Sequence, residues 1–140
     1  MMNVMLLHQR AKKMQVQIGA GNFELKEEQI ELRAGCRFGV SFSNDKKHCL
    51  ATLIETIESV ESPENFFIEI EVEGEFETEK FEDEDSKREV HVESYYALFP
   101  YVQQLIAQLS MAAGVAPIMI RPEKMTKDGV HFGKEERTED

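Results

Sequence analysis

The side chains that could support catalysis are few and widely separated in this sequence. Its four histidines are His8, His48, His91 and His131. Only His48 stands beside a potential nucleophile, Cys49, and neighbours in an extended segment point to opposite faces. His91 has Glu89 and Glu93 at metal-like spacing, but one histidine with two flexible carboxylates falls short of a ligand set. We therefore predict neither a catalytic Cys–His pair nor a metal site.

Paired carboxylates and phosphate-binding glycines are the other chemistry to consider. Two catalytic carboxylates need a pocket that raises the pKa of one of them, and a solvated row of glutamates offers no such difference. Gly19 and Gly21 lack the full spacing of a phosphate-cradling loop and a following helix. The sequence therefore predicts a protein that is not an enzyme and needs no cofactor.

The most regular pattern in the chain is a run of glutamates at every odd position from Glu69 to Glu79. Strict alternation with apolar residues predicts a strand that carries its carboxylates on one face, and Gly74 is expected to mark a bulge or bend. One interpretation is a docking surface for a basic partner, because concentrated charge speeds association. The other is the solvated face of a sheet, where charge discourages edge-to-edge aggregation. The docking candidates in this run are Glu69, Glu71, Glu73, Glu75 and Glu77.

The net charge of −11 comes from this part of the chain. Between Glu55 and Glu93 there are 16 acidic and 3 basic residues, whereas the remainder has 11 acidic and 13 basic ones. Nucleic-acid binding needs Lys and Arg to displace counterions from phosphates, so we expect no nucleic-acid partner.

The cysteines and the N-terminus indicate a reduced, cytoplasmic protein. Cys36 and Cys49 form no CxxC pair and are expected to be reduced rather than a disulfide framework. The apolar run Val4–Leu7 is too short for a signal peptide or a membrane span. We expect cytoplasmic localisation and no membrane insertion.

The chain of 140 residues fits one domain. Period-two patterns predict four strands, at Met14–Ile18 (with a possible continuation at Phe23–Leu25), Cys36–Phe42, Leu50–Val60 and Phe66–Glu79. The third strand is apolar on both faces, which favours a central position in the sheet. We expect the strands to form a meander.

A helix follows the strands. Apolar residues recur at three- and four-residue spacing at Leu98, Val102, Leu105, Ile106, Leu109 and Ala113. We expect a helix from about Pro100, a residue suited to the first turn, to Ala113, with Gly114 as its C-terminal cap. Residues 81–93 are expected to be a solvated connector. The order predicts an α+β fold in which a four-stranded antiparallel sheet is followed by one long amphipathic helix.

Leu98-Phe99-Pro100-Tyr101 is similar to the sequence that opens the long helix of the SecB family. The segment Gly114–Pro122 also resembles that family, and the resemblance covers about Met14 to Pro122. The chain looks closest to a small group of uncharacterised Gram-positive SecB-like proteins. We therefore expect a SecB-like domain at residues 1–122 and a polar, mobile tail at 123–140, with a possible anchor at Val130 and Phe132.

The resemblance implies ATP-independent binding of extended or unfolded polypeptides by a chaperone or adaptor linked to protein export. It places the client groove at Phe38, Val40 and Phe42, and an acidic surface for the SecA motor at Glu24 and Glu71. It also implies a homo-dimer or homo-tetramer joined through the helix, for which the interface candidates are Leu98, Tyr101, Val102, Leu105, Ile106 and Leu109. The same helix stripe would equally serve to pack on the chain's own sheet.

One departure from the family concerns the end of the chain. The family's final apolar helix would follow Pro122, where this sequence is polar and interrupted by Gly129. The groove is therefore expected to be shallower. The alternative function is a docking module whose acidic sheet face binds one basic protein partner.

Overall fold

The computed structural model describes residues 2–19 and 31–130. The strands are β1 (Val4–Ile18), β2 (Leu32–Phe42), β3 (His48–Ser59) and β4 (Phe66–Thr78). A 29-residue helix, α1 (Glu84–Ala112), follows them, and short 3-10 turns lie at η2 (Pro63–Asn65) and η3 (Lys127–Gly129). The predicted fold, a four-stranded antiparallel sheet followed by one long helix, is confirmed. No helix in the described ranges is long and apolar enough to cross a membrane.

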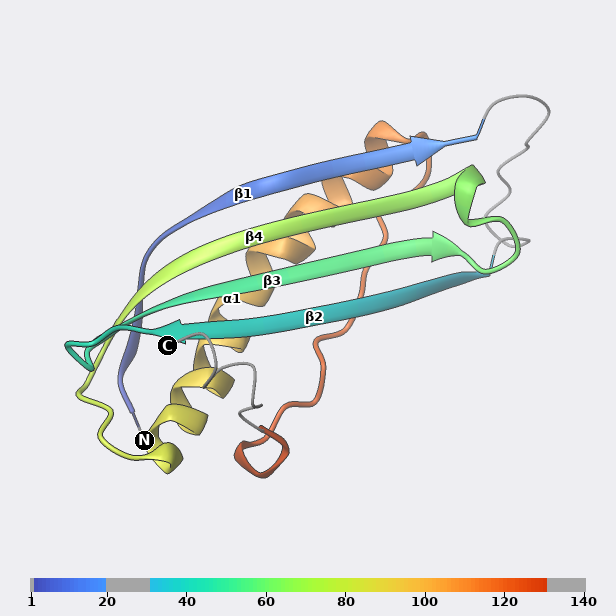
Figure 1. Cartoon of the computed structure of the whole chain (residues 1–140). Coiled ribbons are helices and arrows are strands. Elements are labelled where there is room, and N and C mark those ends of the chain that lie inside the picture. Colours follow the sequence, from blue (N-terminus) through green and yellow to red (C-terminus); the bar gives the residue numbers. More distant parts are fainter. Residues whose placement is uncertain (1, 20–30, 131–140) are drawn as a thin grey trace.

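The strand order in the sheet is β1-β4-β3-β2, with every neighbouring pair antiparallel (Figure 1). β2, β3 and β4 form consecutive hairpins, whereas β1 pairs with β4, so the sheet has Greek-key order and the expected meander was wrong. Periodicity predicts which segments are strands but carries no information about which strand lies beside which. The predicted central position of the third strand is confirmed.

β1 is much longer than the sequence pattern predicted. The strand begins at Val4, ten residues before the expected start at Met14. Its pairing with β4 shifts register between Leu6 and His8 and again between Ala11 and Lys13. Each bulge inserts one residue and reverses which alternate positions face the core. The apolar residues therefore lose their period of two, and the expected continuation at Phe23–Leu25 lies outside the described residues.

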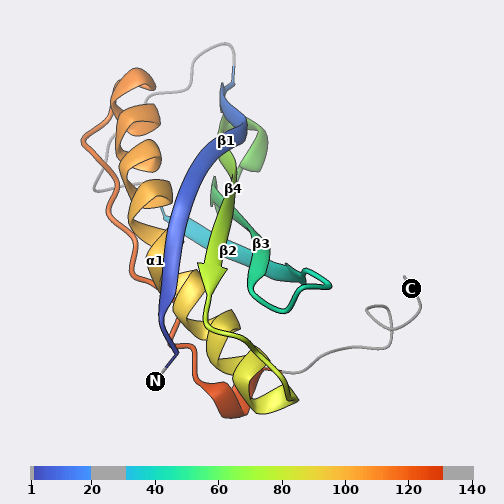
Figure 2. The same ribbon diagram turned by 90° about the vertical axis from the view of Figure 1, so that its left-hand side faces the viewer.

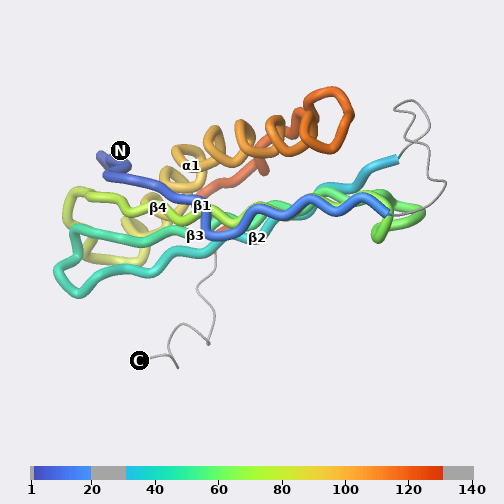
Figure 3. Tube along the Cα trace, turned by 90° about the horizontal axis from the view of Figure 1, so that it is seen from above, coloured from blue at the N-terminus to red at the C-terminus, as the bar shows by residue number. Residues whose placement is uncertain are grey.

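The helix lies across one face of the sheet, so the fold has two layers (Figures 2 and 3). The core between the layers contains, among others, Leu53, Ile57, Ile68, Ile70, Val72 and Phe76 from the sheet and Val90, Tyr95, Leu98, Val102 and Ile106 from the helix. β4 carries no bulge at Gly74, because its pairing with β3 runs through this residue without a break; the nearest register shift lies on β1, opposite Glu75 and Phe76. Instead, a Cβ at Gly74 would lie 2.8 Å from Leu98 Cδ1, so the missing side chain lets the helix approach the strand closely.

The start of α1 was predicted wrongly. The helix begins at Glu84, so most of the expected connector at residues 81–93 is helical, and Pro100 lies inside the helix instead of in its first turn. A capping box starts it: the Asp83 carboxylate accepts from Ser86 N at 2.8 Å, and Ser86 Oγ accepts from Asp83 N at 3.2 Å. Pro100 is exposed, and it lacks the N–H that would bond the carbonyl of Tyr96.

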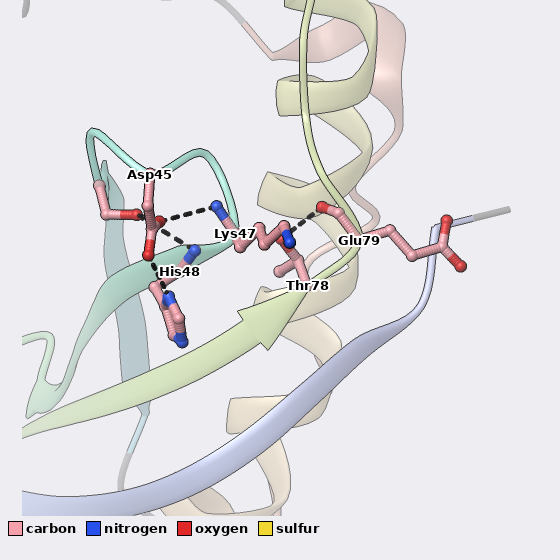
Figure 4. A network of polar contacts seen from close by, with 6 residues as sticks. Asp45, Lys47, His48, Thr78 and Glu79 are labelled. Atoms are coloured by element: carbon pink, nitrogen blue, oxygen red, sulfur yellow. Dashed lines mark hydrogen bonds and ion pairs between the residues drawn. The ribbon is translucent and has the colours of Figure 1, made fainter.

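The β2–β3 hairpin is closed by a polar network around Asp45 (Figure 4). The Asp45 carboxylate accepts from Lys47 N at 2.9 Å, contacts His48 Nδ1 at 2.8 Å and accepts from Ser43 Oγ. These hydrogen bonds hold the pKa of Asp45 well below its usual range. His48 and Cys49 face opposite sides of the strand, as the sequence indicated, so this network belongs to the turn.

Candidate functional site

Phe38, Val40 and Phe42 alternate along β2, and all three face the helix side of the sheet. β2 is an edge strand, so these side chains are only half-buried while they pack against the core. We call them the β2 strip. An apolar strip at an open sheet edge is a surface on which an extended chain can be held by backbone hydrogen bonds and side-chain pockets.

Aromatic contacts position the two rings of the β2 strip. The Phe38 ring lies edge-on to His91 and Tyr95 of α1, with centroid distances of 5.0 and 5.3 Å. The Phe42 ring lies 5.0 Å from Phe81, again nearly edge-on. Such pairs restrict each ring to a defined orientation, so the strip is a preformed surface.

Beyond α1 the chain turns and runs back along the helix on the side of β2 (Figure 1). Gly114 makes the turn with φ of +89°, as a C-terminal cap requires, which confirms its prediction. We call residues 117–130 the strap. Its end is anchored: Val130 is only 5% exposed, and Lys127 Nζ lies 3.3 Å from Asp85 Oδ2.

Side chains of α1 hold the backbone of the strap. Gln103 accepts from Ile120 N at 2.8 Å and donates to Ile118 O at 2.9 Å. The Tyr96 hydroxyl accepts from Met125 N at 2.8 Å. The strap is therefore fixed in an extended conformation without joining the sheet.

A surface hollow of about 350 Å³ lies between the strap and β2. It is lined by Cys36 and Phe38 of β2 and by Glu123, Lys124, Met125, Thr126 and Gly129 of the strap. The apolar wall is thus provided by the sheet edge and the more polar wall by the strap.

A buried carboxyl lies close to this hollow. Glu55 of β3 faces the helix side of the sheet and is 4% exposed. Burial raises the pKa of Glu55 to about 7, and the negative charge of Glu123 adds to the shift. Burial also raises the pKa of the neighbouring Cys36 thiol to about 12, so that thiol stays protonated and donates a hydrogen bond to Glu55.

A chain of hydrogen bonds joins Glu55 to the strap. Glu123 N donates to the Tyr95 hydroxyl at 2.6 Å. Tyr95 is hydrogen-bonded to Cys36, and Cys36 to Glu55. The position of the strap and the ionisation of a buried carboxyl are therefore linked through two side chains.

The glutamates of β4 lie on the opposite face of the sheet from α1. Five of them, Glu69, Glu71, Glu73, Glu75 and Glu77, share this side, which we call the acidic face. Their predicted alternation is confirmed. Glu24, the remaining docking candidate, lies outside the described residues.

Basic residues of β1 pair with three glutamates of the acidic face. Lys13 Nζ lies 3.2 Å from Glu69, Arg10 2.9 Å from Glu73 and His8 Nε2 2.7 Å from Glu75. These cross-strand pairs help to fix β1 on the edge of the sheet. Lys13 and Arg10 thereby neutralise part of the charge on this face within the chain.

The oligomer-interface candidates on α1 divide into two groups. Leu98, Val102 and Ile106 are fully buried against the chain's own sheet and leave no surface for a partner. Tyr101 is exposed, and Leu105 and Leu109 are partly buried. All six candidates were chosen because apolar residues recur at helical spacing. This spacing also marks the side of the helix that packs on the chain's own sheet, so three of the six are core residues.

Sequence reasoning missed two groups that the structure brings to this region. Glu55 occupies an inward position between Leu53 and Ile57, and reading the third strand with a strict period of two would have found it. Gln103 carried no signal, because its partners are backbone groups of the strap.

Comparison with known proteins gives a family match over nearly the whole chain. Residues 3–126 match the family model described as preprotein translocase subunit SecB. No curated protein matches the sequence.

Two solved structures share the fold. The SecB-like chaperone Rv1957 of Mycobacterium tuberculosis, in complex with a ChAD peptide from the antitoxin HigA1, is 11% identical, with a TM-score of 0.65; the alignment covers 86% of this chain and 88% of that one. A protein of unknown function from Streptococcus agalactiae is 16% identical, with a TM-score of 0.52, over 86% of this chain and 98% of that one. At these identities the likeness concerns the fold.

Proposed function

The chain belongs to the SecB family, and from that premise we propose that it binds extended or unfolded polypeptides without ATP, as a chaperone or adaptor. The observation that carries this proposal is the β2 strip, two half-buried aromatic rings and a valine at an open sheet edge beside a hollow. The solved SecB-like chaperone with a bound peptide supports the same kind of ligand.

The geometry favours an extended ligand. No other described strand pairs with the outer edge of β2, so its backbone N–H and C=O groups can bind a guest strand. Alternate guest side chains would then pack on Phe38, Val40 and Phe42. Backbone hydrogen bonds are the same for every sequence, so such a site selects extended apolar segments rather than one motif.

Binding to reduced, carboxymethylated α-lactalbumin, a permanently unfolded probe, tests the proposal in the absence of nucleotide. We expect Phe42→Ser to weaken binding, because truncating a well-packed interface aromatic costs on the order of 1–2 kcal/mol, which is about tenfold in Kd. Leu50→Ser is the matched control, since Leu50 is 40% exposed on the opposite face of the sheet. The proposal fails if the wild-type chain neither binds the probe nor slows aggregation of an unfolding protein.

The family also supports assembly, a cytoplasmic location and a link to export. We propose a homo-dimer or homo-tetramer that uses the exposed side of α1, where Tyr101, Leu105 and Leu109 keep accessible surface. Light scattering of the wild-type chain and of Tyr101→Glu tests this assembly. Co-purification with the SecA motor tests the export link, which rests on the description of the family as a preprotein translocase subunit.

The alternative function is a docking module for one basic protein. Its support is that Glu71 and Glu77 form no ion pair with any other residue in the described ranges, so part of the acidic face keeps its charge for a partner. Salt dependence separates this alternative from apolar groove binding.

A further inference from the structure

The strap resembles a bound ligand more than an element of secondary structure. It lies extended on α1, and its backbone groups are satisfied by helix side chains instead of by a strand. Gln103 pairs with both Ile118 O and Ile120 N, the two groups that a neighbouring strand would take. Tyr96 contacts the backbone of Met125 on both sides, accepting from its N–H at 2.8 Å and lying 3.4 Å from its carbonyl.

The strap's apolar contacts also follow the pattern of an extended guest. Ile118 and Ile120 pack against the core, whereas Met119 between them is 72% exposed. Met125 packs inward again. The strap is thus held by two apolar side chains on either side of one exposed residue and by hydrogen bonds to its backbone. A helix surface that makes these contacts recognises an extended conformation and the spacing of apolar residues more than a particular sequence.

Charge opposes closure of the strap. The negative charge of Glu123 adds to the cost of ionising the buried Glu55, and the nearby groups Cys36 of β2 and Tyr95 of α1 are not cations. Opening the strap would hydrate Glu55 and remove Glu123. The closed strap therefore has a built-in destabilising contact.

We propose that the strap is a displaceable intramolecular ligand. Residues 118–125 occupy a site on α1 where the side chains of Gln103, Tyr96 and Tyr95 form hydrogen bonds with the strap backbone. An extended guest polypeptide replaces the strap at this site. The inference rests on the proposed function and adds a second site to the β2 strip. The guest must supply an N–H to Gln103, so it carries a residue other than proline at the position of Ile120.

Loosening the strap tests this inference on the full chain. Ile120→Ser removes a strap anchor and leaves every residue of α1 and β2 in place, so we expect it to bind carboxymethylated α-lactalbumin more tightly, by about tenfold, as the fraction of open chains rises. Met111→Ser makes a comparable change at an exposed position outside the strap, where the side chain is 54% exposed, and should leave the Kd unchanged. If the strap were a fixed wall of the groove, Ile120→Ser would weaken binding, and that result overturns the inference.

Hydrogen exchange on the wild-type chain gives a readout that needs no variant. We expect the amides of Ile120, Glu123 and Met125 to exchange faster when the probe is bound, because the strap then leaves Gln103, Tyr95 and Tyr96. If the probe binds and these amides stay protected, the inference fails while the proposed function stands. If neither the wild-type chain nor Ile120→Ser binds the probe, the proposed function fails as well.

Discussion

At the scale of single residues, Glu55 combines an ionisable carboxyl with a buried position, since it is 4% exposed. Its pKa is raised from 4.5 to about 7 because it is buried and lies near Glu123. The folded chain therefore holds this proton more tightly than the unfolded chain does. Its contribution to stability is full below pH 4.5, decreases as the pH rises and is lost above about pH 7. Asp45 and Asp83, whose pKa values are lowered, act in the opposite direction at acidic pH.

Glu55→Gln should remove this pH dependence. The amide keeps an acceptor for Cys36 and carries no charge, so we expect the variant to be more stable than the wild type at pH 8 by on the order of 1–3 kcal/mol, with little difference at pH 5. Urea unfolding at both pH values measures this. Glu71→Gln, on the acidic face, is the control. An equal change for Glu55→Gln at both pH values would contradict the assignment.

Gly74 shows how one missing side chain sets the distance between the two layers. We expect Gly74→Ala to destabilise the fold by about 1–3 kcal/mol, because the new Cβ would lie 2.8 Å from Leu98 Cδ1 and overpacking forces side chains off their rotamers. Thermal unfolding followed by circular dichroism measures the loss. Gly39→Ala is the matched control, since its Cβ meets nothing within 4 Å. Equal effects of the two substitutions would refute the packing role.

At the scale of elements, the sequence predicted the bounds of a strand well where one face is apolar and the other is charged. β4 alternates without interruption, so its bounds came out within one residue. β1 did not, because two bulges break its alternation, and α1 did not, because Pro100 in the sequence resembles a helix start. The three client-binding candidates lie together on the half-buried β2 strip, as their alternation in the sequence suggested. The contacts of Gln103 with the strap backbone could not be predicted, because they depend on no pattern of residue types.

Pro100 inside α1 gives a prediction about this element. Pro100→Ala restores the N–H that can bond the carbonyl of Tyr96, and a proline in a helix interior costs about 3 kcal/mol relative to alanine. Pro100 is exposed, so the substitution removes little packing. We expect a gain of about 1–3 kcal/mol in urea unfolding. A loss of stability would show that the proline ring is needed for a contact outside the helix.

At the scale of the whole molecule, the acidic face and the apolar β2 strip lie on opposite faces of one sheet. The β2 strip and the strap lie on the helix side, and the acidic face lies on the other. A guest on the helix side therefore does not meet the acidic face. A basic partner on the other side would meet glutamates that β1 has already paired in part. The two candidate functions thus use separate surfaces and can be tested in the same chain.

Salt and charge reversal separate the two surfaces. Raising the salt concentration from about 20 to about 500 mM shortens the screening length several-fold, so a partner held by the acidic face should lose more than about tenfold in affinity, whereas apolar binding on the β2 strip should change less than about threefold. The reversal should be made at Glu71 and Glu77. Lysine at Glu73 would face Arg10 and loosen β1 as well, which would confuse docking with stability. We expect Glu71→Lys with Glu77→Lys to leave the Kd for carboxymethylated α-lactalbumin unchanged, as measured by fluorescence anisotropy. A large loss of probe binding in this variant, with the fold intact by circular dichroism, would move the polypeptide site to the acidic face.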